Sequence, residues 1–150
     1  MEIRRILAPT DFSEFSKQAI QYAYELAQKF GARLLLLHVV ELQAYPVDIF
    51  LPSEAGTTLL EDLEHQARLD LAQLVPKAQD GPVEVTRQAV VGTPYHKIVE
   101  VAAAEKVDLI VMATHGRTGL SHLFIGSVAE RVVRMAPCPV LTIRPTASAA

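Results

Sequence analysis

The sequence predicts an α/β fold in a single domain, with helices on both faces of an open parallel sheet. Its 150 residues are 50% hydrophobic and 21% charged, which is typical of one compact globular domain, and the chain is too short for two. Apolar runs of strand length alternate with segments of helical periodicity in the order β-α-β-α-β-α-β-α-β. Such alternation indicates parallel strands joined by right-handed crossovers, and runs that are apolar on both faces indicate strands covered by helices on both sides.

The first three elements are a strand, a helix and a strand. Apolar residues 3–8 predict a buried strand that ends at Pro9, and a helix follows. The apolar side chains of this helix, Phe30 among them, recur at helical spacing, and Gly31 stands where a left-handed C-cap is needed. Residues 33–40 are apolar on both faces and predict the second strand.

A long irregular connection over residues 41–57 separates that strand from the next helix. A connection of this length is usually functional or mobile, and we expect it to act as a lid. Thr58 and Glu61 match a capping box, which predicts a long helix from there to about Asp80. Residues 83–91 begin by alternating apolar and polar side chains, which predicts an edge strand with one wetter face.

The remaining elements complete the alternation. Thr93 followed by Pro94 combines an N-cap residue with proline at the first helical position, which predicts a helix there. A short helix begins at Gly126 and Ser127, with Val133 among its inward side chains. The predicted ranges of these last elements are helix 93–106, strand 108–113, loop 114–125, helix 126–136 and strand 140–143.

Composition and charge limit the cellular compartment and the classes of partner that we expect for the protein. We expect residues 1–145 to form the domain and residues 146–150 to be a flexible tail. The net charge is −3 with no basic run, so the electrostatic surface of a nucleic-acid binder is absent. No apolar stretch approaches the ~18 residues needed to span a bilayer, and no targeting segment is recognisable. The single cysteine, Cys138, allows no internal disulfide, so we expect a cytoplasmic protein with neither a membrane nor a nucleic acid as partner.

Two predicted loops leave the carboxyl ends of strands, which is where open parallel sheets bind ligands. In the second loop, Gly116, Gly126 and Ser127 stand between a strand and a helix, so backbone N–H groups and a helix N-terminus converge there. Glycines permit close approach of an anion, while Ser127 adds a hydroxyl donor and Arg117 a charge, which together predict a phosphate site. The alternative is that these glycines only make turns.

Four short motifs mark the ends of the predicted strands. They are Pro9-Thr10-Asp11, Leu37-His38-Val39, Ala113-Thr114-His115-Gly116 and, nine residues later, Gly126-Ser127. With these motifs the chain resembles the ATP-binding branch of the universal stress protein family, over nearly its whole length. In that branch the pattern reads glycine, two residues, glycine, nine residues, glycine, then serine or threonine. This chain departs from it only at Ala113, where the added methyl group implies weaker binding rather than none.

The resemblance implies an adenine nucleotide lying across the carboxyl end of a five-stranded sheet of order 3-2-1-4-5, a Rossmann-like fold of the adenine-nucleotide alpha-hydrolase type. ATP would bind with Mg²⁺ or Mn²⁺, and the ion would be held mainly by phosphate oxygens and water rather than by protein ligands. The adenine would meet the backbone of Val39, and the triphosphate would lie over the glycine loop. The site residues that the resemblance implies are Pro9, Thr10, Asp11, Val39, Met112, Ala113, His115, Gly116, Arg117, Gly126, Ser127 and Val128.

The roles of the titratable residues near this site stay open. A carboxylate beside a triphosphate is repulsive, so Asp11 either accepts a proton from the nucleoside or faces the metal ion. Alternatively, Asp11 or Ser13 only caps the first helix. His115 either senses the nucleotide charge or ties the loop to a backbone carbonyl, and His38 is expected to be a hydrogen-bonded core histidine.

The last strand is expected at an edge of the sheet, where an apolar strand needs a partner. The resemblance implies a homodimer, closed by a twofold axis, through the residues Val140, Leu141, Thr142 and Ile143. The alternative is a monomer whose tail covers the edge.

The function that the resemblance implies is that of an ATP-binding regulatory or stress-protection module. Bound ATP would order the connection over residues 41–57 and change a surface for an unknown protein partner, as a nucleotide-dependent switch. No catalytic residue is predicted, because no pattern of nucleophile and base is present, and at most weak ATP hydrolysis is expected. Two alternatives stay open: an ATP-independent dimeric stress protein that acts through protein contacts, and a slow ATPase or adenylyl or phosphoryl transferase.

Overall fold

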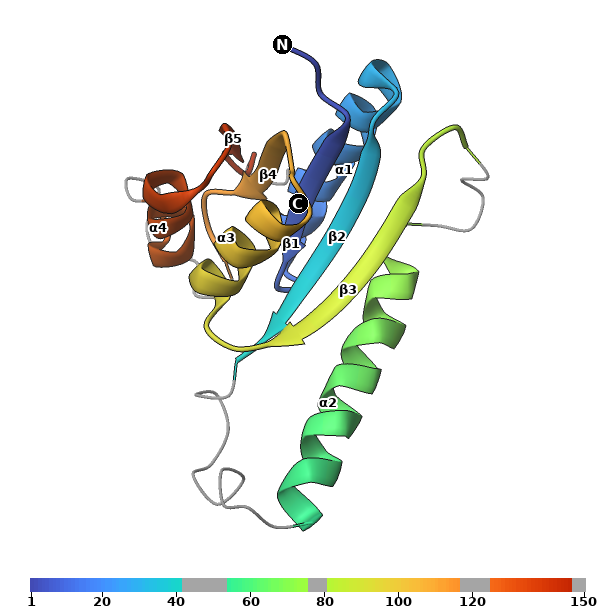
Figure 1. The fold of residues 1–150 in the computed structure, drawn as a ribbon, viewed down its shortest axis with the longest axis vertical. Coiled ribbons are helices and arrows are strands. Elements are labelled where there is room, and N and C mark those ends of the chain that lie inside the picture. Colours follow the sequence, from blue (N-terminus) through green and yellow to red (C-terminus); the bar gives the residue numbers. More distant parts are fainter. Residues whose placement is uncertain (42–53, 76–80, 117–124, 147–150) are drawn as a thin grey trace.

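The computed structural model describes residues 1–41, 54–75, 81–116 and 125–146, and Figure 1 labels its helices and strands. Strands and helices alternate along the chain as predicted. The elements are β1 (Arg5–Thr10), α1 (Glu14–Phe30), β2 (Arg33–Val40), α2 (Glu54–Gln73), β3 (Val85–Val91), α3 (Pro94–Ala104), β4 (Leu109–Ala113), α4 (Ser127–Met135) and β5 (Val140–Ile143). Within the described ranges, no helix combines the length and the hydropathy needed to cross a bilayer.

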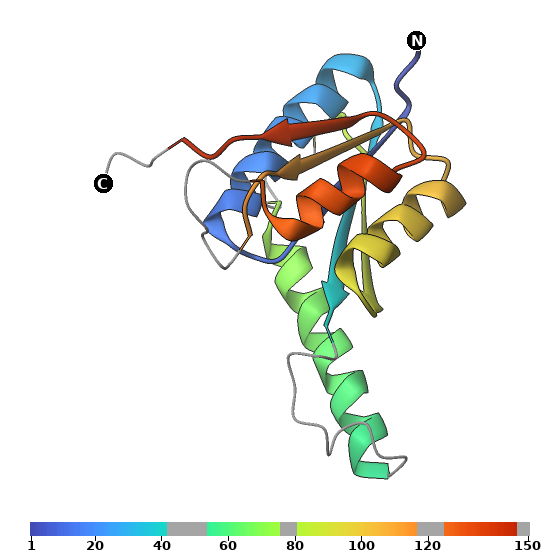
Figure 2. The ribbon, with the colours of Figure 1, turned by 90° about the vertical axis from the view of Figure 1, so that its left-hand side faces the viewer.

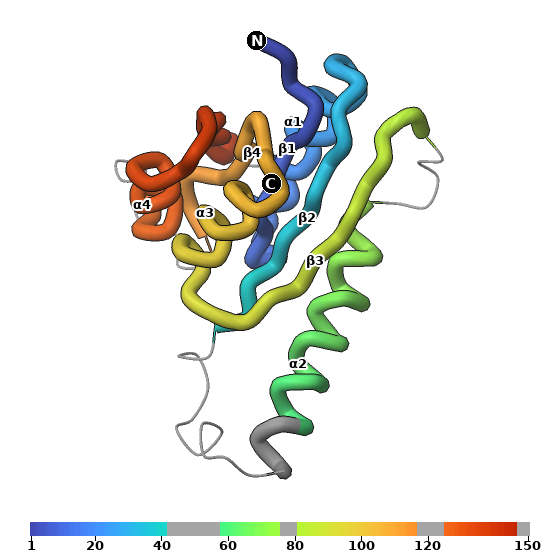
Figure 3. The backbone as a smooth tube through the Cα atoms, in the orientation of Figure 1, coloured from blue at the N-terminus to red at the C-terminus, as the bar shows by residue number. Residues whose placement is uncertain are grey.

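The five strands form one parallel sheet in the order β3-β2-β1-β4-β5, which confirms the predicted fold class and strand order. β1 lies in the centre, where Ile6 pairs with Leu34 of β2 and with Leu109 of β4. After β3 the chain crosses back over β2 and β1 to begin β4, a path that can be followed in Figure 3. The strand order therefore reverses at β1, and the carboxyl ends of β1 and β4 flank the switch point at which such sheets bind ligands.

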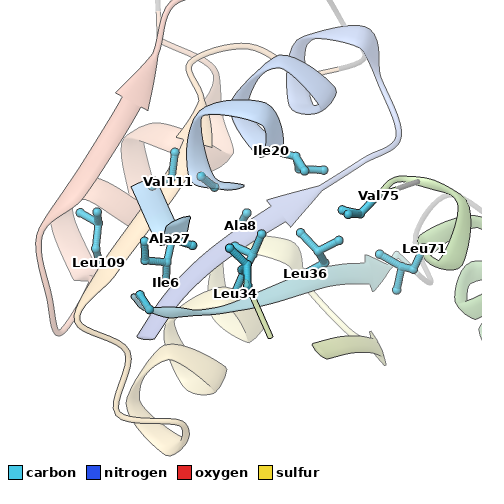
Figure 4. Packing of buried hydrophobic residues seen from close by; sticks show 13 residues of the cluster. Ile6, Ala8, Ile20, Ala27, Leu34, Leu36, Leu71, Val75, Leu109 and Val111 are labelled. Atoms are coloured by element: carbon cyan, nitrogen blue, oxygen red, sulfur yellow. The ribbon is translucent and has the colours of Figure 1, made fainter. Parts of the chain in front are cut away.

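Two layers of helices bury the two faces of the sheet (Figure 2). α1 and α2 pack on one face, over strand side chains such as Ile6, Leu34 and Leu36, as Figure 4 shows. α3 and α4 pack on the other face, over side chains that include Leu7 and Ile110. Successive residues of each strand thus point into alternate cores, which is why the central strands read as apolar without interruption.

α1 begins and ends where its sequence predicts. Ser13 is the N-cap, and its side chain accepts a hydrogen bond from the backbone N–H of Ser16 at 3.2 Å. Gly31 ends the helix in the left-handed conformation, with φ at 65°. Phe30 was predicted inward but is half exposed, because the buried face of the helix is narrower than its apolar spacing suggested.

The first strand was predicted to end at Pro9, but it does not end there. β1 continues to Thr10, and Pro9 is paired in register with Leu37 of β2. Proline lacks a backbone donor but keeps its carbonyl acceptor, so the extended conformation carries on for one more residue.

The predicted start and end of α2 were both wrong. The helix begins at Glu54, so Thr58 lies in its second turn and cannot be an N-cap, and the connection after β2 is correspondingly shorter than predicted. It ends at Gln73 rather than near Asp80, because Pro76 disfavours the helical conformation for the residue before it. Most of the predicted lid, residues 42–53, lies outside the described residues, as do residues 147–150 of the predicted tail.

The inward face of α4 differs at one position. Val133 was predicted to point inward but is 49% exposed. Ala129 and Val132 are the buried side chains of this helix. The helices and strands after β3 begin within one residue of the predicted positions. α3 begins at Pro94 and α4 at Ser127.

Candidate functional site

A cavity of about 420 Å³ lies at the carboxyl end of the sheet. Its walls come from the ends of β1, β2 and β4, from α2 and α3, and from the start of α4. The structure brings together here the predicted site residues that it describes, namely Pro9, Thr10, Asp11, Val39, Met112, Ala113, His115, Gly116, Gly126, Ser127 and Val128. The twelfth, Arg117, lies outside the described residues. Their part in binding a nucleotide stays a prediction.

Hydrogen bonds hold the loop that follows β1. The Ser16 hydroxyl donates to the Ser13 carbonyl at 2.9 Å, so the buried Thr10 hydroxyl donates in turn to Ser16 Oγ, also at 2.9 Å. The N–H of Phe12 donates to Thr10 Oγ1, and this bond supports Phe12 in a left-handed conformation with φ at 65°. Asp11 Oδ1 accepts from the N–H of Ser13 at 3.0 Å. The loop therefore presents Asp11 to the cavity while Ser13 caps α1.

The glycine loop lies directly against the loop after β1. A Cβ atom added at Gly116 would stand 2.8 Å from Asp11 Oδ2. One added at Gly126 would stand 3.1 Å from the carbonyl oxygen of Thr114, which already accepts a hydrogen bond from the N–H of Gly126. The φ of Gly126 is an ordinary −58°, so glycine is needed there for the space it leaves. The glycines therefore do more than form turns, because they let the glycine loop lie close to the loop after β1 and to the carbonyl of Thr114.

α4 starts at the cavity wall, with Gly126 as its N-cap. As a glycine, the N-cap residue has no side chain to cap the helix, and Ser127 and Val128 of the first turn line the cavity. The positive end of the helix dipole and the backbone N–H groups of the first turn are therefore available to an anion. Such a wall suits a phosphate group.

The side of the cavity beneath α3 is apolar. Ile98 of α3 lies here opposite Val39 and Met112, and all three are buried. An apolar wall of this kind accepts a planar ring such as a nucleobase. Pro94 and Ile98 were not predicted as site residues. The Thr93-Pro94 start signal indicated them, since helices that follow parallel strands begin at the carboxyl edge.

One face of α2 forms a further wall that the sequence analysis missed. The cavity-lining residues of this helix are spaced three and four apart: Leu63, Gln66, Ala67 and Asp70. Gln66 Nε2 donates to Asp70 Oδ1 at 3.0 Å. Leu63 and Ala67 share the apolar face of this helix with Leu71, and nothing in the pattern shows where the core ends and the cavity begins.

Carboxylates are the charged groups on the described walls of the cavity. Asp11, Glu41 and Asp70 line it, and no lysine or arginine of the described ranges does so. Three carboxylates disfavour a bare polyanion through like-charge repulsion. A phosphate-bearing ligand would therefore need a cation.

Two histidines of the described ranges line the cavity, and the structure gives each a hydrogen-bond partner. His38 Nδ1 lies 2.8 Å from the carbonyl oxygen of Thr10, which can only accept, so this nitrogen carries the proton. Its ring lies 4.4 Å from that of Phe12, centroid to centroid. His115 Nδ1 lies 2.8 Å from the hydroxyl of Thr114. The hydrogen bond expected of His38 is present, but the residue is half buried at the cavity and not in the core.

Cys138 lies outside the lining of the cavity and is half buried. Burial raises the pKa of its thiol, with the charge of Asp108 acting in the same direction against a backbone hydrogen bond from Ile110 that lowers it. A raised pKa disfavours the thiolate, which is the nucleophilic form. Among the described residues, no three His, Cys, Asp or Glu side chains are grouped to hold a metal ion.

Comparison with known proteins gives the family. Residues 2–144 match the model of the Universal stress protein family. The universal stress protein MJ0531 of Methanocaldococcus jannaschii is 36% identical over 142 residues, which cover 94% of this chain and 82% of that protein. The solved structure of MJ0577 from the same organism superposes with a TM-score of 0.85 at 30% identity, covering 99% of this chain and 100% of the other. A universal stress protein solved in complex with cAMP shares the fold, with a TM-score of 0.66 at 23% identity over 97% of this chain and 100% of that one.

Proposed function

Because the chain belongs to the universal stress protein family, we propose that it is an ATP-binding regulatory or stress-protection module of the cytoplasm. One observation carries the proposal: a single cavity joins an apolar wall to a glycine loop at a helix N-terminus. A base and a triphosphate need these two environments side by side. The solved relative that holds cAMP supports the choice of an adenine nucleotide.

In this proposal the adenine lies by the backbone of Val39 and over Met112, and the phosphates lie over the glycine loop. Gly116 and Gly126 leave room for phosphate oxygens, and Ser127 offers a hydroxyl donor. The methyl group of Ala113 stands between the two ends of the nucleotide. It weakens binding without preventing it.

Mg²⁺ or Mn²⁺ accompanies the nucleotide in this proposal. The three carboxylates on the described walls support a cation that neutralises the phosphates. Asp11 fits such an ion, because its Oδ2 lies against Gly116 of the phosphate loop while its Oδ1 is held by Ser13. Magnesium commonly binds through one carboxylate together with phosphates and water.

We propose binding rather than catalysis as the activity. In this proposal Asp11 holds the cation, and His115 holds the glycine loop through the hydroxyl of Thr114. Neither side chain then serves as the general base that activation of water needs. Purified protein should therefore hydrolyse ATP slowly at most, and rapid turnover that disappears in Asp11→Asn or His115→Ala would contradict this view.

The switch part of the proposal couples ATP to a protein partner. Bound ATP orders the connection between β2 and α2 and changes the surface that a partner meets, to the extent that the two states bind ATP differently. The chain acts as a homodimer joined through β5 (Val140–Ile143), which lies at an edge of the sheet. An ATP-independent dimer that works through protein contacts is the alternative if no nucleotide binds.

Isothermal titration with ATP tests the proposal, using protein stripped of copurified nucleotide. Wild-type protein should bind at micromolar concentration or tighter with Mg²⁺, and more weakly when the ion is omitted. Gly126→Ala should lose binding, because the added methyl group meets the Thr114 carbonyl where phosphates approach. Gly31→Ala is the matched control, since the left-handed C-cap of α1 is strained by a side chain but lies away from the cavity.

The titrations separate the two functions. Binding that survives in Gly31→Ala and disappears in Gly126→Ala supports a nucleotide at the glycine loop. No binding by folded wild-type protein, with or without Mg²⁺, contradicts the ATP proposal and favours the ATP-independent alternative.

A further inference from the structure

The cavity has two chemically different ends. The glycine loop follows β4, whereas α2 packs on β2 and β3, on the other side of β1. Figure 1 shows α2 and α4 on opposite sides of that central strand. Neighbouring strands are about 4.8 Å apart, so β2 and β4 are separated by about 10 Å. A ligand that reaches both ends must therefore span about this distance, and different chemical groups of the ligand meet the glycine loop and α2.

The α2 end is built to accept hydrogen bonds. Gln66 Nε2 donates to Asp70 Oδ1 at 3.0 Å, which orients the carboxylate. The second oxygen of Asp70 and Oε1 of Gln66 can only accept. Glu41 adds a further carboxylate to the lining. A phosphate is repelled by this wall, and a neutral donor such as a hydroxyl or an amino group is attracted.

A surface pair at this helical spacing is often no more than a weak stabiliser of the helix. Here the pair belongs to a continuous stripe, since Leu63 and Ala67 line the cavity on the same face. Ala67 is buried against the fold, Asp70 is half buried and Gln66 is exposed. The core contacts of α2 therefore fix the place of Asp70 on the cavity wall, and the hydrogen bond from Gln66 orients its carboxylate.

We propose that Asp70 is a specificity-determining residue of the cavity. It accepts hydrogen bonds from donor groups of the nucleoside, with Gln66 as its positioning residue. The ligand then binds in one direction only, with phosphates at the glycine loop and its hydroxyl or amino groups toward α2. This inference rests on the proposed function, because it presupposes a nucleotide in the cavity.

The test compares ligands that lack one donor at a time. Stripped protein is titrated, with Mg²⁺, with ATP, 2′-deoxy-ATP, 3′-deoxy-ATP and inosine triphosphate, which replaces the amino group of adenine by a carbonyl. Wild-type protein should bind ATP about tenfold more tightly than the analogue without the recognised donor, as expected for a hydrogen bond to a charged acceptor. The analogue that loses affinity distinguishes a ribose hydroxyl from the amino group.

Asp70→Asn keeps the shape of the side chain and removes its charge. It should bind ATP about tenfold more weakly than wild type and lose the preference for ATP over that analogue. Asp62→Asn is the matched control, because Asp62 is an exposed carboxylate of the same helix outside the cavity lining, and it should rank the ligands as wild type does.

Gln66→Ala is a second variant that tests the proposal even if Asp70→Asn fails to fold. It should retain ATP binding while the ratio between ATP and the analogue falls. If wild type binds ATP but Asp70→Asn and Gln66→Ala leave every ratio unchanged, the role of Asp70 is overturned and the nucleotide site stands. If wild type binds none of the four ligands, both proposals fall together.

Discussion

At the candidate site, the presence or absence of a single Cβ atom decides how closely the backbone could approach the proposed nucleotide. Ala113 ends β4 at the cavity, and its side chain is 8% exposed. The motif that the sequence resembles has a glycine at this place. The other two glycines of the motif, Gly116 and Gly126, have neighbours within 3.1 Å of an added Cβ atom, so the loop tolerates little extra volume. We therefore expect the methyl group of residue 113 to reduce the affinity of the proposed ATP site.

Ala113→Gly should raise the affinity for ATP several-fold, because the ribose and phosphates gain the volume of the methyl group. It should also lower the free energy of unfolding by roughly 0.5–1 kcal/mol, since glycine in a strand loses more conformational entropy on folding. Titration and thermal denaturation measure the two effects. Ala89→Gly in β3 is the control, with the stability loss and no gain in affinity. Equal affinities of Ala113→Gly and wild type would show that the methyl group is irrelevant.

Among the helices and strands, α2 differs most along its length in how far it packs on the rest of the fold. Leu71 near its carboxyl end is buried in the core, as is Val75 just after the helix, whereas its amino-terminal half projects beyond the sheet (Figures 1 and 2). Arg87 of β3 donates from Nε to the carbonyl oxygen of Leu71 at 3.0 Å, near the end of the helix. The same carbonyl accepts a hydrogen bond from the N–H of Leu74 at 3.3 Å, so the bond from Arg87 is a second one that ties the end of α2 to the edge of the sheet.

Arg87→Met should loosen that tie while keeping the apolar stem of the side chain. We expect the free energy of unfolding to fall by about 0.5–1.5 kcal/mol, the usual contribution of such a bond, and backbone amides near the end of α2 to exchange faster. Hydrogen exchange and chemical denaturation measure this. Arg68→Met, which removes an exposed ion pair to Glu64 on the same helix, should change neither by much.

The elements also show what sequence can and cannot predict. Gly31 and the Thr93-Pro94 pair carry local backbone chemistry, so the helix ends that they mark were predictable. The left-handed conformation of Phe12 depends on the Thr10 hydroxyl, a contact that no local pattern encodes. The cavity face of α2 was hidden for a similar reason: an amphipathic spacing tells which residues share a face, but tertiary packing decides what that face meets.

For the whole molecule, the exposed edge of the sheet at β5 is the feature with the largest consequence. Leu141 is 39% exposed there, and an apolar edge strand offers unpaired backbone groups to another chain. We expect the protein to be a dimer in solution. Leu141→Lys should shift it toward monomer, measured by light scattering coupled to size exclusion.

Leu69→Lys provides the control for the dimer, since Leu69 is also exposed, at 47%, but lies on α2, away from β5. This variant should remain dimeric. A wild-type protein that is monomeric at high concentration would contradict the dimer, and the tail of the chain would then be the candidate cover for the edge. The strand order was predictable because the resemblance implied it and the alternation of strands and helices indicated a parallel sheet, whereas the dimer through β5 stays a prediction from the resemblance.

The central place of β1 has a consequence for synthesis on the ribosome. β1 is made first, but its second neighbour in the sheet, β4, is made only after three helices and two further strands have left the ribosome. Ile6 must wait for Leu109 before one side of the central strand is paired, and the glycine loop follows later still. A nascent chain therefore cannot complete its cavity until most of it has emerged, and during that interval the open side of β1 is exposed to other partners, chaperones among them.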